Sequence, residues 1–96
     1  MRPKKTRWVK CATAPRLFEP QPRGRASKRA IVLSLDEFEA VRLLDHERLS
    51  QIQVARHMRV GRSTVSRIVS SARRKIAKAL VDISVLKVEG GCCRVV

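Results

Sequence analysis

The sequence predicts a mainly α fold in which three helices form one small domain. A serine three positions before a Glu or Gln is the spacing of a helix-capping box, and it occurs at Ser34 and again at Ser50. Apolar residues then recur at every third or fourth position, as they do along one buried face of a helix. A chain of 96 residues can bury only a modest core, which suits a single domain of this kind.

The first predicted helix begins after Ser34 and runs to about Asp45. Its broad apolar face is formed by Phe38, Ala40, Val41, Leu43 and Leu44. Three acids, Asp36, Glu37 and Glu39, stand near its start, where the helix dipole favours negative charge. We interpret this segment as a core and support helix.

The second helix is expected over residues 51–58 and the third from Arg62 to about Leu80. Val54 and Met58 would face the core from the second helix, and Val60 would fill the turn. The buried stripe of the third helix is predicted to be Val65, Ile68, Val69, Ala72, Ile76, Ala79 and Leu80. This order of apolar positions is the pattern of a helix-turn-helix.

Two segments outside the helices are predicted as short strands, residues 31–33 and residues 84–88. They are expected either to pair with each other as a two-stranded β ribbon or to pair with another subunit. Residues 1–30 contain all four prolines and are predicted to form a basic, extended and largely irregular N-terminal arm. The helix-turn-helix domain is then residues 31–91, and residues 92–96 are a C-terminal tail.

The net charge of +14 is distributed in blocks. Residues 1–30 hold ten basic groups and one acid, residues 31–49 hold two basic groups and five acids, and residues 50–80 hold eight basic groups and no acid. Ordinary surface helices mix both signs and form pairs four positions apart. Two cationic blocks on either side of an acidic helix indicate a polyanion as the partner.

Several segments together resemble one small, uncharacterised prokaryotic family. They are residues 33–43 (LSLDEFEAVRL), 49–51 (LSQ), 71–80 (SARRKIAKAL) and 88–91 (VEGG). The family consists of predicted DNA-binding proteins with a helix-turn-helix similar to region 4 of sigma factors. The resemblance covers about residues 8–91 and implies binding to double-stranded DNA.

Two positions in the predicted turn depart from that family. Arg59 stands where a glycine is usual, and this position often closes the second helix in a left-handed conformation that costs a non-glycine residue about 1 kcal/mol. Gly61 stands where a serine commonly caps the third helix, and glycine caps without a side-chain acceptor. We expect the turn to be retained with slightly lower stability.

We expect a sequence-specific transcription regulator that inserts the helix starting near Arg62 into the major groove of double-stranded DNA. The candidate base contacts are Arg62, Ser63, Thr64, Ser66 and Arg67. The candidate phosphate contacts are Gln51, Gln53, Arg56, Arg73, Arg74 and Lys78. In the arm, Arg23, Gly24 and Arg25 resemble the core of a minor-groove hook, and the alternative is a merely basic linker.

Two other functions fit the same sequence: a less specific architectural DNA or RNA binder, and a protein-interaction module on a sigma-like fold. Only three aromatic residues are present, too few for a platform on which single-stranded bases stack. The sequence contains no catalytic constellation and no phosphate-binding loop, so we expect neither an enzyme nor a bound cofactor. Cys11, Cys92 and Cys93 are odd in number and two of them are adjacent, so we predict free thiols and no disulfide framework. Adjacent cysteines are also poorly spaced for a zinc site.

No apolar run is long enough to cross a bilayer and the N-terminus lacks a secretory pattern, so a cytoplasmic protein is expected.

One helix-turn-helix contacts only a few base pairs. We therefore predict a homodimer that binds an inverted repeat with half-sites about 34–36 Å apart. The sequence identifies neither an effector nor the regulated genes.

Overall fold

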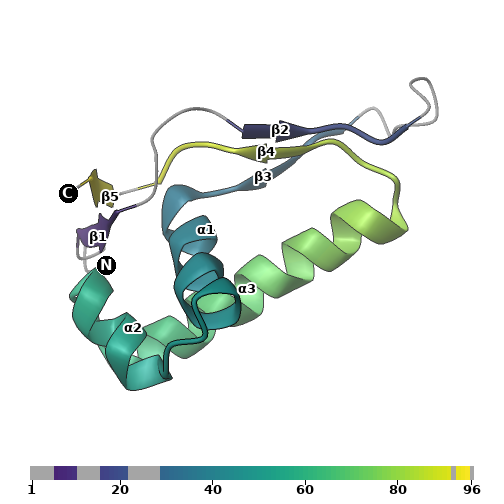
Figure 1. Cartoon of the computed structure of the whole chain (residues 1–96). Helices are drawn as coiled ribbons and strands as arrows, with labels where there is room; N and C mark the ends of the chain where they lie inside the picture. Colours follow the sequence, from purple (N-terminus) through teal and green to yellow (C-terminus); the bar gives the residue numbers. More distant parts are fainter. Residues whose placement is uncertain (1–5, 11–15, 22–28, 92, 96) are drawn as a thin grey trace, which may run out of the picture.

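The computed structural model describes residues 6–10, 16–21, 29–91 and 93–95 (Figure 1). The helices are α1 (Leu35–Val41), the π-helical turn η1 (Arg42–His46), α2 (Gln51–Met58) and α3 (Arg62–Val81). The strands are β1 (Arg7–Val9), β2 (Arg16–Phe18), β3 (Ile31–Leu33), β4 (Leu86–Val88) and β5 (Cys93–Val95). The fold is therefore three helices with a small mixed sheet.

The three-stranded sheet has the order β2-β4-β3 and lies across the ends of α1 and α3 (Figure 1). β3 and β4 pair in parallel, with Leu33 opposite Val88. Of the two alternatives predicted for these segments, the structure confirms pairing within the chain. The predicted strand at residues 84–88 is shorter than expected. The amide of Ser84 instead donates to the carbonyl of Ala79 at 2.9 Å, which closes the end of α3.

The N-terminal residues supply two strands that the sequence analysis did not predict. β2 pairs antiparallel with β4, with Arg16 opposite Val88, and β1 pairs in parallel with β5. The expectation of a largely irregular arm is thus wrong for residues 7–9 and 16–18. Residues 7–9 and 16–18 each begin with an arginine and lack the continuous apolar run that marks residues 31–33, and their hydrogen-bond partners lie at the other end of the sequence.

The main core is formed where α1, η1, α2 and α3 meet. Its buried members are Ala40, Leu43, Val54, Ala55, Met58, Val65, Ile68 and Val69. A second cluster, Leu33, Ala72 and Val88, joins the sheet to the middle of α3. The apolar faces predicted for the helices are confirmed, with one exception: Leu80, expected in the buried stripe, is 76% exposed. It lies near the end of α3, beyond the helices that cover its first turns.

The two capping sites begin their helices as predicted. At α2 the Gln53 amide donates to the Ser50 hydroxyl oxygen at 3.2 Å, and the Ser50 amide donates to Gln53 Oε1 at 2.9 Å. At α1 the Ser34 amide donates to Glu37 Oε1 at 3.0 Å. The first helix does not continue unchanged to Asp45. After Val41 its backbone widens into η1, where the Glu47 amide bonds the Arg42 carbonyl at 2.8 Å, five residues back.

Arg59 closes α2 in the left-handed conformation that the sequence predicts, with φ of 56° and ψ of 47°. Its guanidinium carbon lies 3.3 Å from the centre of the Trp8 ring, so the turn is fastened to β1 by a cation–π contact. Gly61 caps α3 without a side-chain hydrogen bond, also as expected. The contact with Trp8 offsets part of the backbone strain at Arg59.

We expect Arg59→Ala to lower the free energy of unfolding by about 1 kcal/mol, because it removes the cation–π contact and keeps the left-handed strain. Arg59→Gly should be close to neutral, since relief of strain offsets the lost contact. Urea unfolding of both variants checks this. Equal destabilisation by alanine and glycine would show that the backbone conformation at residue 59 is not strained.

Two further non-glycine residues lie in the left-handed region: Arg48, before α2, with φ of 61°, and Ile83, in the connection after α3, with φ of 53°. A β-branched residue is rare there because its side chain crowds the backbone.

Within the described part of the chain, no helix combines the length and the apolar composition needed to cross a bilayer.

Candidate nucleic-acid interface

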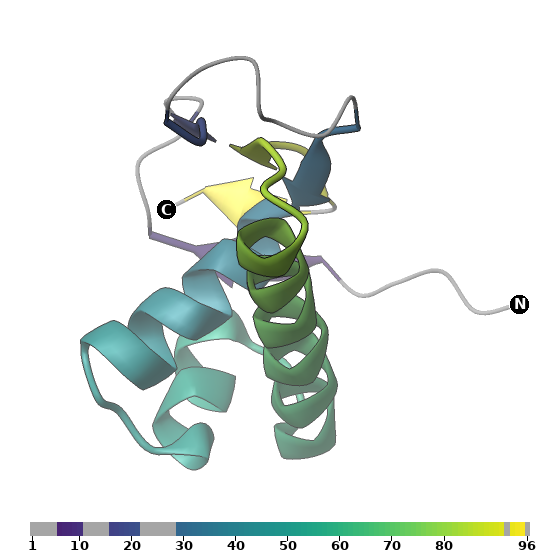
Figure 2. The same ribbon diagram turned by 90° about the vertical axis from the view of Figure 1, so that its right-hand side faces the viewer.

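The five candidate base contacts occupy the first two turns of α3. Arg62, Ser63, Ser66 and Arg67 are exposed and Thr64 is half-buried, while Val65 and Ile68 anchor the same turns in the core. Figures 1 and 2 place α2 and the start of α3 on the side of the molecule away from the β2-β4-β3 sheet. The exposed side chains are therefore held on a rigid element with an open surface in front of them.

Arg67 and Thr64 lie one turn apart on this face. Arg67 Nη2 is 3.5 Å from Thr64 Oγ1, at the limit of a hydrogen bond. No acidic side chain among the described residues pairs with Arg67 or Thr64. Such a long contact leaves the guanidinium able to turn outward toward a ligand.

The candidate phosphate contacts fall into three groups. Arg56 and Arg74 are exposed, and neither forms an ion pair with a described residue. Gln51 is half-buried, and Gln53 uses its side chain to cap α2.

The third group consists of cations that pair with acids of the same chain. Arg73 Nη2 lies 2.6 Å from Asp45 Oδ1, and Lys78 Nζ lies 2.7 Å from Asp82 Oδ2. The hydrogen bonds to Asp45 raise the pKa of Arg73 above its usual value. All four side chains are at least two-fifths exposed, so these pairs are solvated and can open. A phosphate would have to compete with the carboxylates, which predicts a smaller contribution from Arg73 and Lys78 than from Arg74.

The acids of α1 are turned inward and neutralised there. Arg7 Nη1 lies 2.9 Å from Asp36 Oδ2, Arg42 Nε lies 2.6 Å from Glu39 Oε1, and Lys75 Nζ lies 2.7 Å from Glu37 Oε1. Their carboxylates are nearly inaccessible to solvent, with side-chain exposures of 9%, 1% and 7%. The acidic helix therefore contributes little negative charge to the outer surface.

Glu37 is the most strongly held of these acids. Burial opposes its ionisation, but hydrogen bonds from Lys75, Ser71 and Ser34 outweigh burial and lower its pKa to about 2. The Ser71 hydroxyl donates to Glu37 Oε2 at 2.6 Å. Since Ser71 and Lys75 belong to α3, this one carboxylate joins the support helix to the helix that carries the candidate base contacts.

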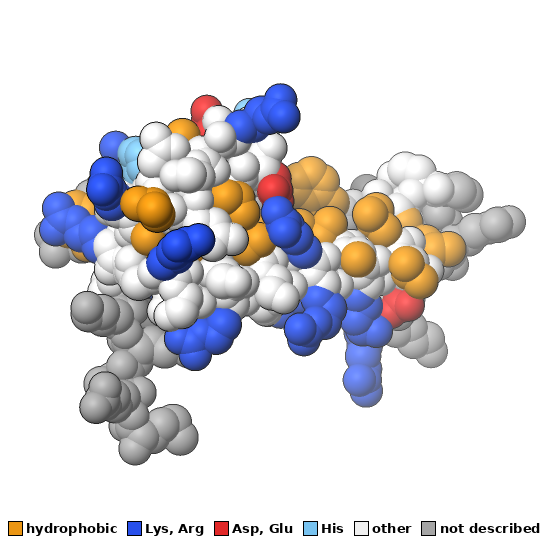
Figure 3. All heavy atoms as spheres, turned by 90° about the horizontal axis from the view of Figure 1, so that it is seen from below, with side chains coloured by type: hydrophobic (Ala, Val, Ile, Leu, Met, Phe, Trp, Pro, Cys, Tyr) orange, Lys and Arg blue, Asp and Glu red, His pale blue; other side chains and the backbone are white. Residues whose placement is uncertain are grey.

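The balance of these contacts leaves a cationic face. Arg56, Arg62, Arg67 and Arg74 are all exposed, and among the described residues none forms an ion pair. Figure 3 shows this face from below, with Lys and Arg side chains spread along α2 and α3 and few acidic side chains between them. We call these four arginines the cationic face.

One contact beside this face is not predictable from the sequence. Trp8 of β1 packs under Arg59 in the α2–α3 turn, and nothing local in the sequence relates these two residues. Arg23, Gly24 and Arg25, the predicted minor-groove residues, lie outside the described residues, as do Cys11 and Cys92. In the described ranges no three His, Cys, Asp or Glu side chains gather closely enough to hold a metal ion.

The chain matches, over residues 1–95, a family described as "Protein of unknown function DUF134". It belongs to this family. Among its relatives, a UPF0251 protein of Thermoanaerobacter pseudethanolicus is 42% identical over 94 residues, covering 98% of this chain and 80% of the relative. A UPF0251 protein of Chlorobaculum tepidum is 42% identical over 90 residues, covering 94% of this chain and 46% of the relative.

Members of the DUF134 family therefore differ in length around a shared part. A UPF0251 protein of Prosthecochloris aestuarii, 43% identical over 90 residues, is covered over 58% of its length. No solved structure matches the chain. The membership of a small uncharacterised prokaryotic family, expected from the sequence, is confirmed. The names of these relatives state no activity.

Proposed function

We propose that this DUF134 protein binds double-stranded DNA through α2 and α3, which act as a helix-turn-helix similar to region 4 of sigma factors. The first turns of α3 enter the major groove, where Arg62, Ser63, Thr64, Ser66 and Arg67 contact base edges. Arg56 and Arg74 contact phosphates on either side. The protein acts in the cytoplasm as a sequence-specific transcription regulator.

The cationic face is the observation that carries this proposal. A protein surface could reduce its self-repulsion by pairing every exposed arginine with an acid, as Arg73 pairs with Asp45. Here the three acids of α1 are buried against Arg7, Arg42 and Lys75, and the four arginines of the cationic face are left for an external anion. A duplex presents closely spaced phosphates that match such a row.

Selection of bound duplexes from random DNA tests the proposal. Recovery of one consensus supports a sequence-specific regulator. Retention of duplexes without a consensus would favour an architectural binder, and failure to retain any duplex would favour a protein-interaction module. The exposed side chains of Ser63 and Ser66 between the arginines favour the first outcome, because hydroxyl groups can bond to base edges.

We expect duplex affinity to fall steeply with salt. If the cationic face and cations of residues 1–30 together neutralise about six phosphates, the logarithm of the association constant should fall against the logarithm of salt with a slope near −5. Fluorescence anisotropy with a labelled duplex over a salt series measures this slope. A nearly flat titration would contradict a phosphate-bound helix pair.

A further inference from the structure

The α2–α3 turn is tied to the N-terminal strand β1 by the stacked side chains of Arg59 and Trp8. The guanidinium carbon of Arg59 lies 3.3 Å from the centre of the Trp8 ring. Arg59 belongs to the turn itself, because it ends α2 three residues before Arg62 begins α3. β1 runs against α1 and α2, with β5 beside it (Figure 1). A segment from the start of the chain therefore contacts the connection that sets the direction of α3.

Local hydrogen bonds hold this turn less firmly than they hold the starts of the other helices. The capping boxes at Ser34 and Ser50 fix the first turns of α1 and α2, whereas Gly61 offers α3 no side-chain acceptor. In the described chain, the space that a Cβ at Gly61 would fill is open, so no side chain supports the turn there. The Arg59 amide donates to the Arg56 carbonyl over a long 3.4 Å. A tie from outside the helix pair therefore has most to add at this turn.

β1 is itself firmly held, so it can restrain the turn. Arg7 Nη1 lies 2.9 Å from Asp36 Oδ2 of α1, and the Lys10 amide donates to a carboxylate oxygen of Glu39 in the same helix. Val9 is fully buried, and β5 pairs with the strand along its length. The strand is thus fixed to the support helix, and its middle residue reaches the turn.

The residue type at position 59 is a second sign that the contact matters. Arg59 has a φ of 56°, and helices usually end in this left-handed conformation with a glycine, which adopts it without strain. The arginine side chain is exposed, so burial in the core does not repay the strain. Its place over the Trp8 ring is the stabilising interaction that a glycine would lack.

We propose that Trp8 is a positioning residue for DNA recognition, which acts through Arg59 to fix the α2–α3 turn and thereby the direction in which α3 enters the major groove. This inference rests on the proposed DNA binding. Phosphate contacts depend mainly on charge and tolerate a small change of direction, whereas two hydrogen bonds to one base edge depend on angle. Loosening the turn therefore lowers the preference for one sequence and leaves the general affinity for duplexes nearly unchanged.

Competition binding of the full chain, with the preferred duplex from the selection and a scrambled duplex, tests this role. We expect Trp8→Leu and Arg59→Gly each to lower the ratio of the two affinities about twofold to fivefold, the effect that one exposed cation–π contact can supply. The double variant should lose no more, because both changes remove the same contact. Trp8→Phe should retain most of the preference, since a phenyl ring also attracts the guanidinium.

Arg48→Gly is the matched control. Arg48 is another exposed arginine in the left-handed region, with φ of 61°, but it precedes α2, and no hydrogen bond or ring contact in the described part of the chain joins it to β1. The substitution removes the same charge and relieves the same strain, so its affinity ratio should equal that of wild type. If Arg59→Gly lowered the salt slope by about 1 and Trp8→Leu did not, Arg59 would be a phosphate contact and the positioning role would be overturned. A wild-type chain that binds duplexes without preference would also overturn it.

Amide hydrogen exchange without DNA separates this inference from the proposed function. The amides of Val60 and Val65, on either side of the turn, each donate to a carbonyl at 3.1 Å. We expect both to exchange about twofold to fivefold faster in Trp8→Leu and Arg59→Gly, while the Phe38 amide in α1 keeps its wild-type rate.

Unchanged exchange at both turn amides would overturn the inference, and so would faster exchange with an unchanged affinity ratio. Faster exchange in a chain that retains no duplex would remove the DNA function and keep Trp8 as the residue that positions the turn.

Discussion

Arg67→Ala is expected to weaken binding to the preferred duplex by about 1–3 kcal/mol and to relax the preference at one base pair. Arg67 stands in the second turn of α3, exposed and held only by the 3.5 Å contact with Thr64, so its guanidinium can donate two hydrogen bonds to a guanine edge. Competition binding with a panel of duplexes, each changed at one base pair, measures both effects.

Arg74 and Arg73 provide the matched controls for Arg67. Arg74→Ala should weaken binding to every duplex alike and reduce the salt slope by about 1, because a phosphate contact carries no sequence information. Arg73→Ala should have a smaller effect, since the Arg73 guanidinium already bonds both carboxylate oxygens of Asp45, at 3.2 and 2.6 Å. If Arg67→Ala and Arg74→Ala gave the same profile across the panel, the separation of base and phosphate contacts would be wrong.

Glu37→Gln is expected to lower the free energy of unfolding at neutral pH by about 2–3 kcal/mol. The carboxylate accepts hydrogen bonds from Lys75 and Ser71 of α3, and its pKa falls from 4.5 to about 2 in the folded protein. A pKa lowered by folding stabilises the protein fully above the unfolded value, by about 1.4 kcal/mol for each pH unit of difference. Glutamine keeps the shape of the side chain and removes the charge.

The pH dependence of this loss separates an electrostatic role from simple packing. The stability that Glu37 contributes is present above pH 4.5 and is lost as the pH falls from there through about 2, so wild type and Glu37→Gln should converge over that range. Glu47→Gln is the control, because the Glu47 side chain is 49% exposed and its contact with Arg42 is 3.5 Å long. Urea unfolding at a series of pH values measures the free energy of unfolding of wild type, Glu37→Gln and Glu47→Gln. A constant difference between wild type and Glu37→Gln at every pH would contradict the ionised pair.

The sequence determined the features that depend on neighbouring residues. The capping serines Ser34 and Ser50 marked the starts of α1 and α2, and the apolar spacing from Val54 to Ile68 gave the limits of α2 and the start of α3. The left-handed Arg59 was expected from the resemblance, because a glycine is usual at this position of the family and helices often end in that conformation. The block of cations without acids was visible from the residues alone.

The candidate interface was predictable only as a set of residues. That Arg62 and Arg67 are exposed follows from helical periodicity, once Val65 and Ile68 are buried. Which cations remain available does not follow, because Arg73 and Asp45 stand on different helices and meet only when α3 packs against η1. The same packing brings Lys75 to Glu37.

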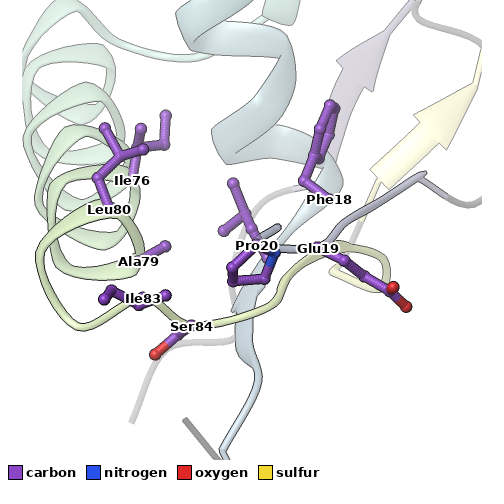
Figure 4. A pocket seen from close by; sticks show the side chains of 9 residues that line it. Phe18, Glu19, Pro20, Ile76, Ala79, Leu80, Ile83 and Ser84 are labelled. Atoms are coloured by element: carbon purple, nitrogen blue, oxygen red, sulfur yellow. The ribbon is translucent and has the colours of Figure 1, made fainter. Parts of the chain in front are cut away.

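Only the tertiary structure decided how the N-terminal and C-terminal segments pair and which apolar residues of α3 stay exposed. β1 and β2 have no continuous apolar run that would mark them as strands, and they form because β5 and β4 offer free backbone groups to them. Leu80 follows the same apolar periodicity as Ile76 and Ala79, yet it is exposed because the space between the last turns of α3 and Phe18 of β2 is an open groove (Figure 4). Local sequence fixes which face of a helix is apolar, whereas the length and position of the other elements decide how much of that face is covered.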